Sequence, residues 1–92
     1  MATYRGTPVN HIVDVRTKLE FFLGHIPGAV CIPVQTLADR IGAHPEIAKS
    51  ATVLVYCQSG HRSAVAMDIL KRLGYARVLD GGAMAQARAG LG

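Results

Sequence analysis

The stretch TVLVYCQSGHRSAVAMDILKRLG, residues 52–74, decides the fold of this 92-residue chain. Its first five residues are apolar, aromatic or β-branched, which is typical of a strand buried on both faces of a parallel sheet. Cys57 follows directly, and after it comes a short polar loop that contains Gly60. The order of strand, loop and helix places Cys57 at the carboxyl end of a strand, the edge of an open α/β sheet where ligands bind.

The segment from about residue 62 to residue 73 has the spacing of an amphipathic helix. Lys71 and Arg72 fall in its last turn, where positive charge suits the helix dipole, and Gly74 is a stop signal. The apolar stripe that we expect to face the sheet consists of Val65, Ala66, Ile69, Leu70 and Leu73.

Three further runs have the short, β-branched character of buried strands: residues 11–15, 29–32 and 77–79. Weaker helical spacing covers residues 18–23, 35–41 and 83–89. The segment GHIPGA, residues 24–29, and the pair Gly81 and Gly82 are expected to be loops. Because strands and helices alternate, we predict one α/β domain over residues 1–92, a three-layer fold whose small central parallel sheet has helices on both faces.

The loop after Cys57 has the composition of a cradle for an anion. Backbone N–H groups from Gln58 through Arg62 can converge near the sulfur, and the helix N-terminus adds partial positive charge. Gly60 allows the tight curve. A lone cysteine after an apolar strand is usually a small buried residue. This combination instead indicates a thiol of lowered pKa, and hence a nucleophile.

Three side chains of the loop add polar groups around the cysteine. Arg62 is the best candidate for contacting an anionic substrate, and its alternative role is an ion pair with a carboxylate at the helix start. His61 either tunes the loop or touches substrate, or else it faces solvent. Ser59 either donates a hydrogen bond inside the loop or is an exposed polar residue. The sequence leaves these alternatives open.

The spacing between Cys57 and Arg62 separates two chemistries. Phosphatases with a cysteine nucleophile place five residues between the cysteine and the arginine, because their loop encloses a phosphoryl group with three equatorial oxygens. Here the four residues QSGH intervene. The smaller loop suits a smaller guest, a single sulfur atom carried on the cysteine.

Charge and hydropathy exclude several classes of partner. Ten Lys and Arg against six Asp and Glu give a net charge of +4, without the blocks of like charge that mark nucleic-acid-binding arms. No stretch approaches the roughly 20 apolar residues of a membrane helix. We therefore expect neither nucleic acid nor a membrane as partner. We place the protein in the cytoplasm, or in the periplasm if a signal peptide has been removed.

The second cysteine and the histidines add no further site. Two cysteines do not suggest a disulfide framework, and two thiols fit a reducing compartment. Cys31 lies in an apolar run, so we expect a buried structural thiol there. The four histidines have no metal-ligand spacing, so we expect no metal and no other cofactor.

Three motifs in order carry a resemblance to a known family. They are DVRTKLEFFLGHIPGAVCIP at residues 14–33, VLVYCQSGHRSAVAMDILKRLGY at residues 53–75, and VLDGG at residues 78–82. Over nearly its whole length, the chain resembles a single-domain rhodanese, which is a rhodanese-like sulfurtransferase.

The resemblance implies a two-step transfer of sulfur through Cys57. The Cys57 thiolate would attack a small anionic sulfur donor such as thiosulfate, become a persulfide, and pass the sulfur to cyanide, a thiol or a protein acceptor. The loop amides would cradle the outer sulfur as an oxyanion hole holds oxygen. The resemblance also suggests that Asp14 and Arg16, at the same sheet edge, brace the site rather than act directly in catalysis. From their residue types, we expect His25 and Pro27 to shape a turn, His25 through a side-chain hydrogen bond and Pro27 through its fixed φ.

Two other functions stay open. One is a catalytically silent rhodanese-like module that docks a partner, although members of that kind often lack the cysteine that this chain retains. The other is a relative of cysteine phosphatases or arsenate reductases, which the four-residue spacing disfavours. The chain has no Trp in the segment after Gly82, where many rhodaneses place an aromatic residue. Only ten residues precede His11, so we expect the N-terminal strand and helix of larger members to be reduced or missing.

Overall fold

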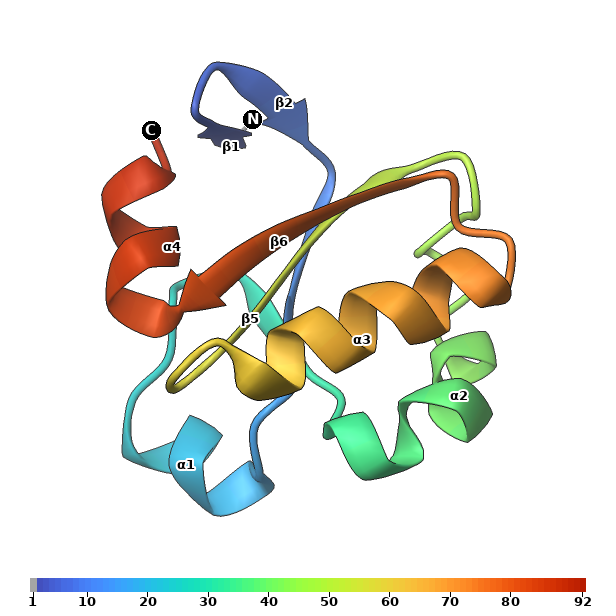
Figure 1. Cartoon of the computed structure of the whole chain (residues 1–92), viewed down its shortest axis with the longest axis horizontal. Helices are drawn as coiled ribbons and strands as arrows, with labels where there is room; N and C mark the ends of the chain where they lie inside the picture. Colours follow the sequence, from blue (N-terminus) through green and yellow to red (C-terminus); the bar gives the residue numbers. More distant parts are fainter. Residues whose placement is uncertain (1) are drawn as a thin grey trace.

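A computed structural model describes residues 2–92, which form a four-stranded parallel sheet in the order β4-β3-β5-β6 (Figure 1). The strands of this sheet are β3 (His11–Asp14), β4 (Ala29–Cys31), β5 (Thr52–Cys57) and β6 (Arg77–Ala83). The helices are α1 (Lys18–Leu23), α2 (Leu37–Arg40), α3 (His61–Arg72) and α4 (Met84–Gly90), and the 3-10 turns η1 (Val34–Thr36) and η2 (Ile41–Ala43) flank α2. Among the described residues, none of the helices has the length and apolar character needed to cross a membrane.

Strand β5 shows how both faces of the sheet are covered. Val53, Val55 and Cys57 pack in one core cluster with residues of α2 and α3. Leu54 and Tyr56 pack in a second cluster, which includes residues of α4. Because successive side chains of a strand point to opposite faces, a strand covered on both sides must be apolar throughout. The predicted α/β fold with a three-layer arrangement is confirmed.

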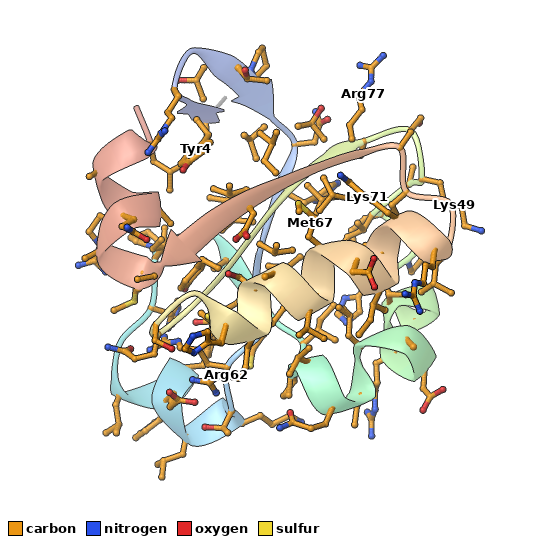
Figure 2. The ribbon with its side chains drawn as sticks, in the orientation of Figure 1. Tyr4, Lys49, Arg62, Met67, Lys71 and Arg77 are labelled. Atoms are coloured by element: carbon orange, nitrogen blue, oxygen red, sulfur yellow. The ribbon has the colours of Figure 1, made fainter. Side chains whose placement is uncertain are left out.

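Residues 2–9 form an antiparallel hairpin, β1 (Ala2–Tyr4) and β2 (Thr7–Val9), which we did not predict. Tyr4 is buried, and its side chain lies between the hairpin and α4 (Figure 2), where Gly90 leaves room for the ring. Two strands of three residues are too short to show an alternating pattern in the sequence. The hairpin contributes Tyr4 and Val9 to the second core cluster, so these few N-terminal residues do help to cover the sheet.

Helix α3 faces the sheet with a stripe that differs in part from the predicted one. Ala66 and Leu70 are buried as expected, but Val65 is 54% exposed. The buried stripe begins instead at Ser63 and continues through Ala66, the partly buried Met67 and Leu70, the i, i+3, i+4, i+7 spacing of a helix face. The error arose because a polar residue, Ser63, occupies a position on the buried face.

Strand β6 continues through the paired glycines that we expected to form a loop. A Cβ atom on Gly81 would lie 3.0 Å from the Val55 carbonyl oxygen and 3.0 Å from the Ala87 Cβ, so a side chain there would force these neighbours to shift. The register between β5 and β6 also shifts between Val55 and Cys57. The glycines therefore mark close backbone contact within a strand rather than a loop.

The parallel strands bring their carboxyl ends to one edge of the sheet. Asp14 at the end of β3 is in register with Cys31 of β4 on one side and with Tyr56 of β5 on the other. Cys57 is the next residue after Tyr56. Both thiols and the Asp14 carboxylate therefore lie at the same edge, as expected for ligand-binding residues of an α/β sheet.

Candidate active site

The structure brings Cys57, the loop after it and the start of α3 together. Cys57 ends β5, residues 58–60 form the loop, and α3 begins at His61. Gly60 has a φ of 100°, in the left-handed region that residues with a side chain rarely adopt. This turn directs the first N–H groups of α3 back toward the cysteine. Cys57 itself is fully buried and belongs to the core cluster on the α3 side of the sheet.

Two backbone N–H groups donate hydrogen bonds to the Cys57 sulfur, that of Gly60 across 3.0 Å and that of Ser63 across 3.3 Å. The Ser63 hydroxyl donates to the Gly60 carbonyl across 3.0 Å. Burial by itself raises the pKa of the Cys57 thiol, but hydrogen bonds from Ser63, Gly60 and Ser59 outweigh it and hold that pKa below its ordinary value. The loop therefore favours the thiolate form of Cys57.

Arg62 forms a bidentate ion pair with Glu20 of α1. The two guanidinium N–H groups donate to the two carboxylate oxygens across 2.7 and 3.0 Å. Figure 2 shows the Arg62 side chain reaching from the first turn of α3 toward α1. The pair lowers the pKa of Glu20 to about 2, with help from the Thr17 backbone. Of the two roles that the sequence left open for Arg62, the ion pair with a carboxylate is present.

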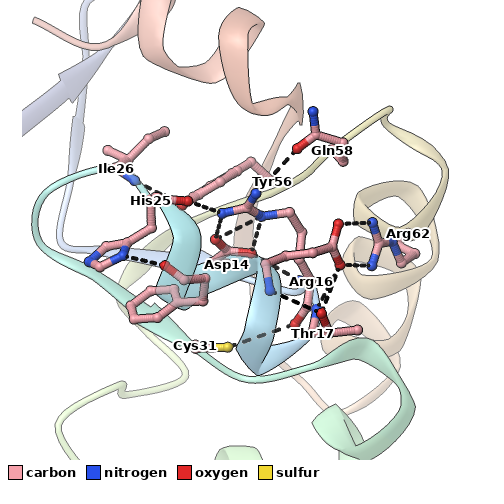
Figure 3. A network of polar contacts seen from close by, with 12 residues as sticks. Asp14, Arg16, Thr17, His25, Ile26, Cys31, Tyr56, Gln58 and Arg62 are labelled. Atoms are coloured by element: carbon pink, nitrogen blue, oxygen red, sulfur yellow. Dashed lines mark hydrogen bonds and ion pairs between the residues drawn. The ribbon is translucent and has the colours of Figure 1, made fainter.

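Asp14 and Arg16 form a buried ion pair at the end of β3 (Figure 3). The Arg16 Nε lies 3.0 Å from both carboxylate oxygens, and its Nη2 lies 2.7 Å from Asp14 Oδ2. Arg16 also donates to the Gln58 side-chain oxygen across 3.2 Å and to the Gly24 carbonyl across 2.6 Å. The pair thereby joins three segments, the end of β3, the loop after Cys57 and the turn after α1.

The turn at residues 24–29 is held by side-chain contacts. The Tyr56 hydroxyl accepts the Ile26 backbone N–H across 3.0 Å, and burial raises the pKa of Tyr56 to about 12. His25 Nδ1 lies 2.8 Å from the Phe21 carbonyl oxygen, and the two rings stack with 3.6 Å between their centroids. The contact of His25 is the side-chain hydrogen bond that we expected in this turn.

The remaining predicted loop residues lie at the surface. The side chains of Gln58, Ser59 and His61 are exposed to solvent. Gln58 lines a cavity of about 420 Å³ beside the loop. The other lining residues belong to α4: Met84, Ala85, Arg88 and Ala89.

Cys31 differs from the buried thiol that we expected, because it is partly exposed. Strand β4 is an edge strand of the sheet, so it lacks a neighbour on one side. The thiol donates a hydrogen bond to the Arg16 carbonyl across 3.7 Å and lines a cavity of about 510 Å³. Partial burial, reinforced by the negative charge of Asp14, raises the pKa of Cys31. The two thiols at this edge therefore have opposite pKa shifts.

The family profile of the rhodanese-like domain matches residues 3–89. The chain belongs to the rhodanese family. Among curated relatives of this rhodanese, a sulfurtransferase from Allochromatium vinosum is 43% identical over 82 residues, which is 87% of this chain and 74% of that protein. Thiosulfate sulfurtransferase PspE from Escherichia coli is 37% identical over 75 residues, 80% of this chain and 70% of that protein.

Solved rhodanese structures have the same fold. A rhodanese with anions from E. coli is similar with a TM-score of 0.75 and 36% identity, and the match covers 83% of this chain and 88% of that one. The human single-domain sulfurtransferase TSTD1 is similar with a TM-score of 0.76 and 26% identity, covering 86% and 80% of the two chains. The rhodanese resemblance seen in the sequence motifs is confirmed.

Three residues at the site of this rhodanese were missed by sequence reasoning. Ser63 donates to the sulfur, Glu20 binds Arg62, and Tyr56 holds the Ile26 backbone. Ser63 shares a helical stripe with Ala66 and Leu70, and a polar residue on an apolar stripe is a signal that could have identified it. No local pattern links Glu20 to Arg62, because 42 residues separate them.

Proposed function

We propose that this rhodanese is a sulfurtransferase that carries sulfur as a persulfide on Cys57. One observation carries the proposal. The Cys57 sulfur receives two backbone hydrogen bonds at the start of α3, which lower the pKa of its thiol although the residue is buried. The similarity to the A. vinosum sulfurtransferase and to PspE, named a thiosulfate sulfurtransferase, supports the same activity.

In the first step, the Cys57 thiolate attacks the outer sulfur of an anionic donor, and thiosulfate is the donor that we propose. A bond forms between the two sulfur atoms while the bond between the donor's two sulfur atoms breaks. Sulfite leaves with the electron pair, and Cys57 carries a persulfide anion. In this proposal the N–H groups of Gly60 and Ser63, which donate to the Cys57 sulfur, stabilise the negative charge of the persulfide.

In the second step, a nucleophile attacks the outer sulfur of the persulfide. Cyanide gives thiocyanate, whereas a thiolate, small or on a protein, gives a new persulfide. In both cases the bond to the Cys57 sulfur breaks, and that sulfur leaves as the thiolate that began the cycle. The low pKa of Cys57 favours this departure, because a weakly basic thiolate is a good leaving group.

The side chains around the loop have supporting roles in this proposal. Asp14 and Arg16 are positioning residues, since the hydrogen bond from Arg16 to Gln58 holds the loop. Arg62 guides the anionic donor, and Glu20 offsets part of its charge. The cavity between Gln58 and Arg88 gives a donor a site of approach beside the loop. Ser59 contributes through its backbone hydrogen bond, which helps to lower the pKa of Cys57, and the side chains of Ser59 and His61 face solvent.

Mass spectrometry of the intact protein tests the proposal. Incubation with thiosulfate should add the mass of one sulfur atom, and peptide mapping should place that atom on Cys57. Cys57→Ser should abolish both the adduct and the formation of thiocyanate, while Cys31→Ser, a matched control, should keep both. An adduct on Cys31 would contradict the site assignment. No adduct with thiosulfate, polysulfide or mercaptopyruvate would instead point to a catalytically silent module that docks a partner.

A further inference from the structure

Helix α1 exposes most of its apolar surface. Its sequence, KLEFFL, contains four apolar residues, yet none of its residues is buried. Leu19, Phe22 and Leu23 are 66%, 82% and 75% exposed. Their i, i+3, i+4 spacing puts them on one face of the helix, and we call these three residues the α1 patch. Contiguous exposed apolar surface of this kind usually marks a place where another molecule binds.

The α1 patch is held beside the Cys57 loop. Glu20 of α1 binds Arg62 in the first turn of α3. The Gly24 carbonyl after α1 accepts an N–H from Arg16, which also donates to Gln58 of the loop. Figure 1 shows α1 next to the connection between β5 and α3. A molecule seated on the patch would therefore lie at the edge of the sulfur-binding loop.

Positive charge flanks the α1 patch. Lys18, the first residue of α1, lines the cavity of about 510 Å³ together with Arg40. His44 also lines it, but its ring is paired with the Glu46 carboxylate. Lys18 and Arg40 are exposed, and neither forms an ion pair with another of residues 2–92. The carboxylate of Glu20 is already bound by Arg62. The charge that complements this rim is negative.

We propose that the α1 patch, with Lys18 and Arg40 beside it, is the docking surface for a protein that accepts the sulfur. That partner is an acidic protein which presents a cysteine thiol within an apolar surface. The inference rests on the proposed function, because it assigns the acceptor of the second step. Apolar contact with Leu19, Phe22 and Leu23 supplies affinity, and the two cations orient the partner.

The size and charge of the patch favour such a partner over a second copy of this chain. A stable homodimer buries about 800 Å² or more on each subunit. Three side chains supply less than that, since even an aromatic side chain buries only about 150–250 Å². Two copies meeting patch to patch would also oppose the cations of one to those of the other. An acceptor that leaves after each transfer needs only a small, short-lived interface.

The transfer at this surface follows the second step already described. The acceptor thiol loses its proton to solvent, and its thiolate attacks the outer sulfur of the Cys57 persulfide. The new bond joins the acceptor sulfur to the transferred sulfur, and the old bond to Cys57 breaks. No oxidant or reductant is consumed, because one persulfide replaces another.

Acceptor kinetics test the inference. The probes are cyanide and two synthetic pentapeptides, each with a central cysteine. The acidic apolar peptide contains two leucines and two aspartates, and the basic polar peptide contains two serines and two lysines. The wild-type protein, loaded from thiosulfate, should transfer sulfur to the acidic apolar peptide with a kcat/KM about tenfold above that for the basic polar one. The triple variant L19S/F22S/L23S should lose most of that preference and keep its rate with cyanide. Val65→Ser, which removes an exposed apolar side chain from α3, is the matched control and should change neither.

The outcomes separate the docking surface from the proposed function. Absence of thiocyanate formation by the wild-type protein would contradict the sulfurtransferase proposal itself. Two results would overturn the docking surface alone, provided that transfer to cyanide is normal. One is an equal rate with both peptides, and the other is a preference for the acidic apolar peptide that persists in the triple variant. Dimers in sedimentation equilibrium that the triple variant abolishes would overturn it in favour of a second copy. Patch-dependent sedimentation with vesicles of phosphatidylcholine and phosphatidylglycerol would overturn it in favour of a lipid surface.

Discussion

The backbone N–H of Gly60 donates to the Cys57 sulfur across 3.0 Å. That contact depends on the left-handed backbone of Gly60, with a φ of 100°, which turns the chain so that the N–H groups before and inside the first turn of α3 face the cysteine. The left-handed conformation of Gly60 and the hydrogen bond to the Cys57 sulfur thus belong to the same turn.

Gly60→Ala should raise the pKa of Cys57 and lower the rate of persulfide formation about tenfold. An added Cβ has space, since its nearest neighbours lie 3.8 Å away in Gly82 and Ala83. The cost is therefore conformational, about 1–2 kcal/mol for a left-handed residue with a side chain. Relaxation of that strain moves the N–H away from the sulfur. The pH dependence of Cys57 alkylation by iodoacetamide, measured in a Cys31→Ser background, checks the pKa.

Gly28→Ala is the matched control for that variant. Gly28 also has a positive φ, 87°, and an added Cβ there meets nothing within 4 Å. Gly28→Ala should lower the free energy of unfolding by a similar amount and leave the pKa of Cys57 unchanged. An equal rise of that pKa in both variants would show that general destabilisation, rather than the Gly60 contact, controls the thiol.

The lowered pKa of Cys57 should make the stability of the protein depend on pH. In the unfolded chain the thiol has its ordinary pKa of about 8.5, so between the two values the unfolded state binds more protons. The free energy of unfolding should therefore rise with pH from the folded-state pKa of Cys57 to about 8.5, and this contribution is lost at lower pH. Urea unfolding at several pH values, compared with Cys57→Ala, checks the slope. A difference between the two proteins that falls with rising pH would contradict it.

Glu20→Gln should lower the KM for thiosulfate by about threefold at low ionic strength, because Arg62 would then keep its full charge for the anionic donor. The loss of stability should stay below about 1 kcal/mol, since about a third of each side chain is exposed to water. The wild-type pair should persist well below pH 4.5, because the pKa of Glu20 is about 2, and its contribution should disappear as the pH falls through that value. Steady-state kinetics at two salt concentrations measure the effect on KM.

Asp68→Asn provides the control for Glu20→Gln. Asp68 pairs with Arg72 in the last turn of α3, so this change removes the same charge far from the loop. It should leave the KM for thiosulfate within experimental error. A similar fall of KM in both variants would mean that net charge, and not Arg62, attracts the donor.

Asp14→Asn should destabilise the protein by about 3–5 kcal/mol, because it leaves the Arg16 guanidinium buried without its charged partner. Replacement of both residues, D14L/R16M, should recover part of that loss, since apolar side chains can fill the site without a buried charge. The rate of sulfur transfer by the double variant should stay below that of the wild type, because the variant lacks the hydrogen bond from Arg16 to Gln58. Urea unfolding and thiocyanate formation measure the two effects. A double variant less stable than Asp14→Asn would refute the electrostatic explanation.

Local sequence patterns predicted the structural elements that are determined by residues close together in the sequence. The strand that ends at Cys57, the turn at Gly60 and the helix after it all follow from one continuous stretch of sequence. Helix α1 also begins and ends at the predicted residues, Lys18 and Leu23. In each case the spacing of apolar residues or a stop signal such as glycine determines the local backbone.

The features that were missed depend on contacts between distant segments. The ion pair of Arg62 is formed with Glu20 on another helix. Val65 is exposed while Ser63 occupies a position on the buried face of α3. Gly81 belongs to strand β6, which pairs with the distant strand β5, and Val55 and Ala87 leave little room there for a side chain. The sequence of each segment alone contains no information about these neighbours.

The opposite shifts at the two thiols have a practical consequence for chemical labelling. Cys31 is the more accessible sulfur, yet its pKa is raised, whereas Cys57 is enclosed and its pKa is lowered. Reagents of different size should therefore label the two thiols selectively. A small electrophile at moderate pH should modify Cys57, and a large maleimide should modify Cys31. The two thiols can then be labelled separately in one chain, without substitution of either residue.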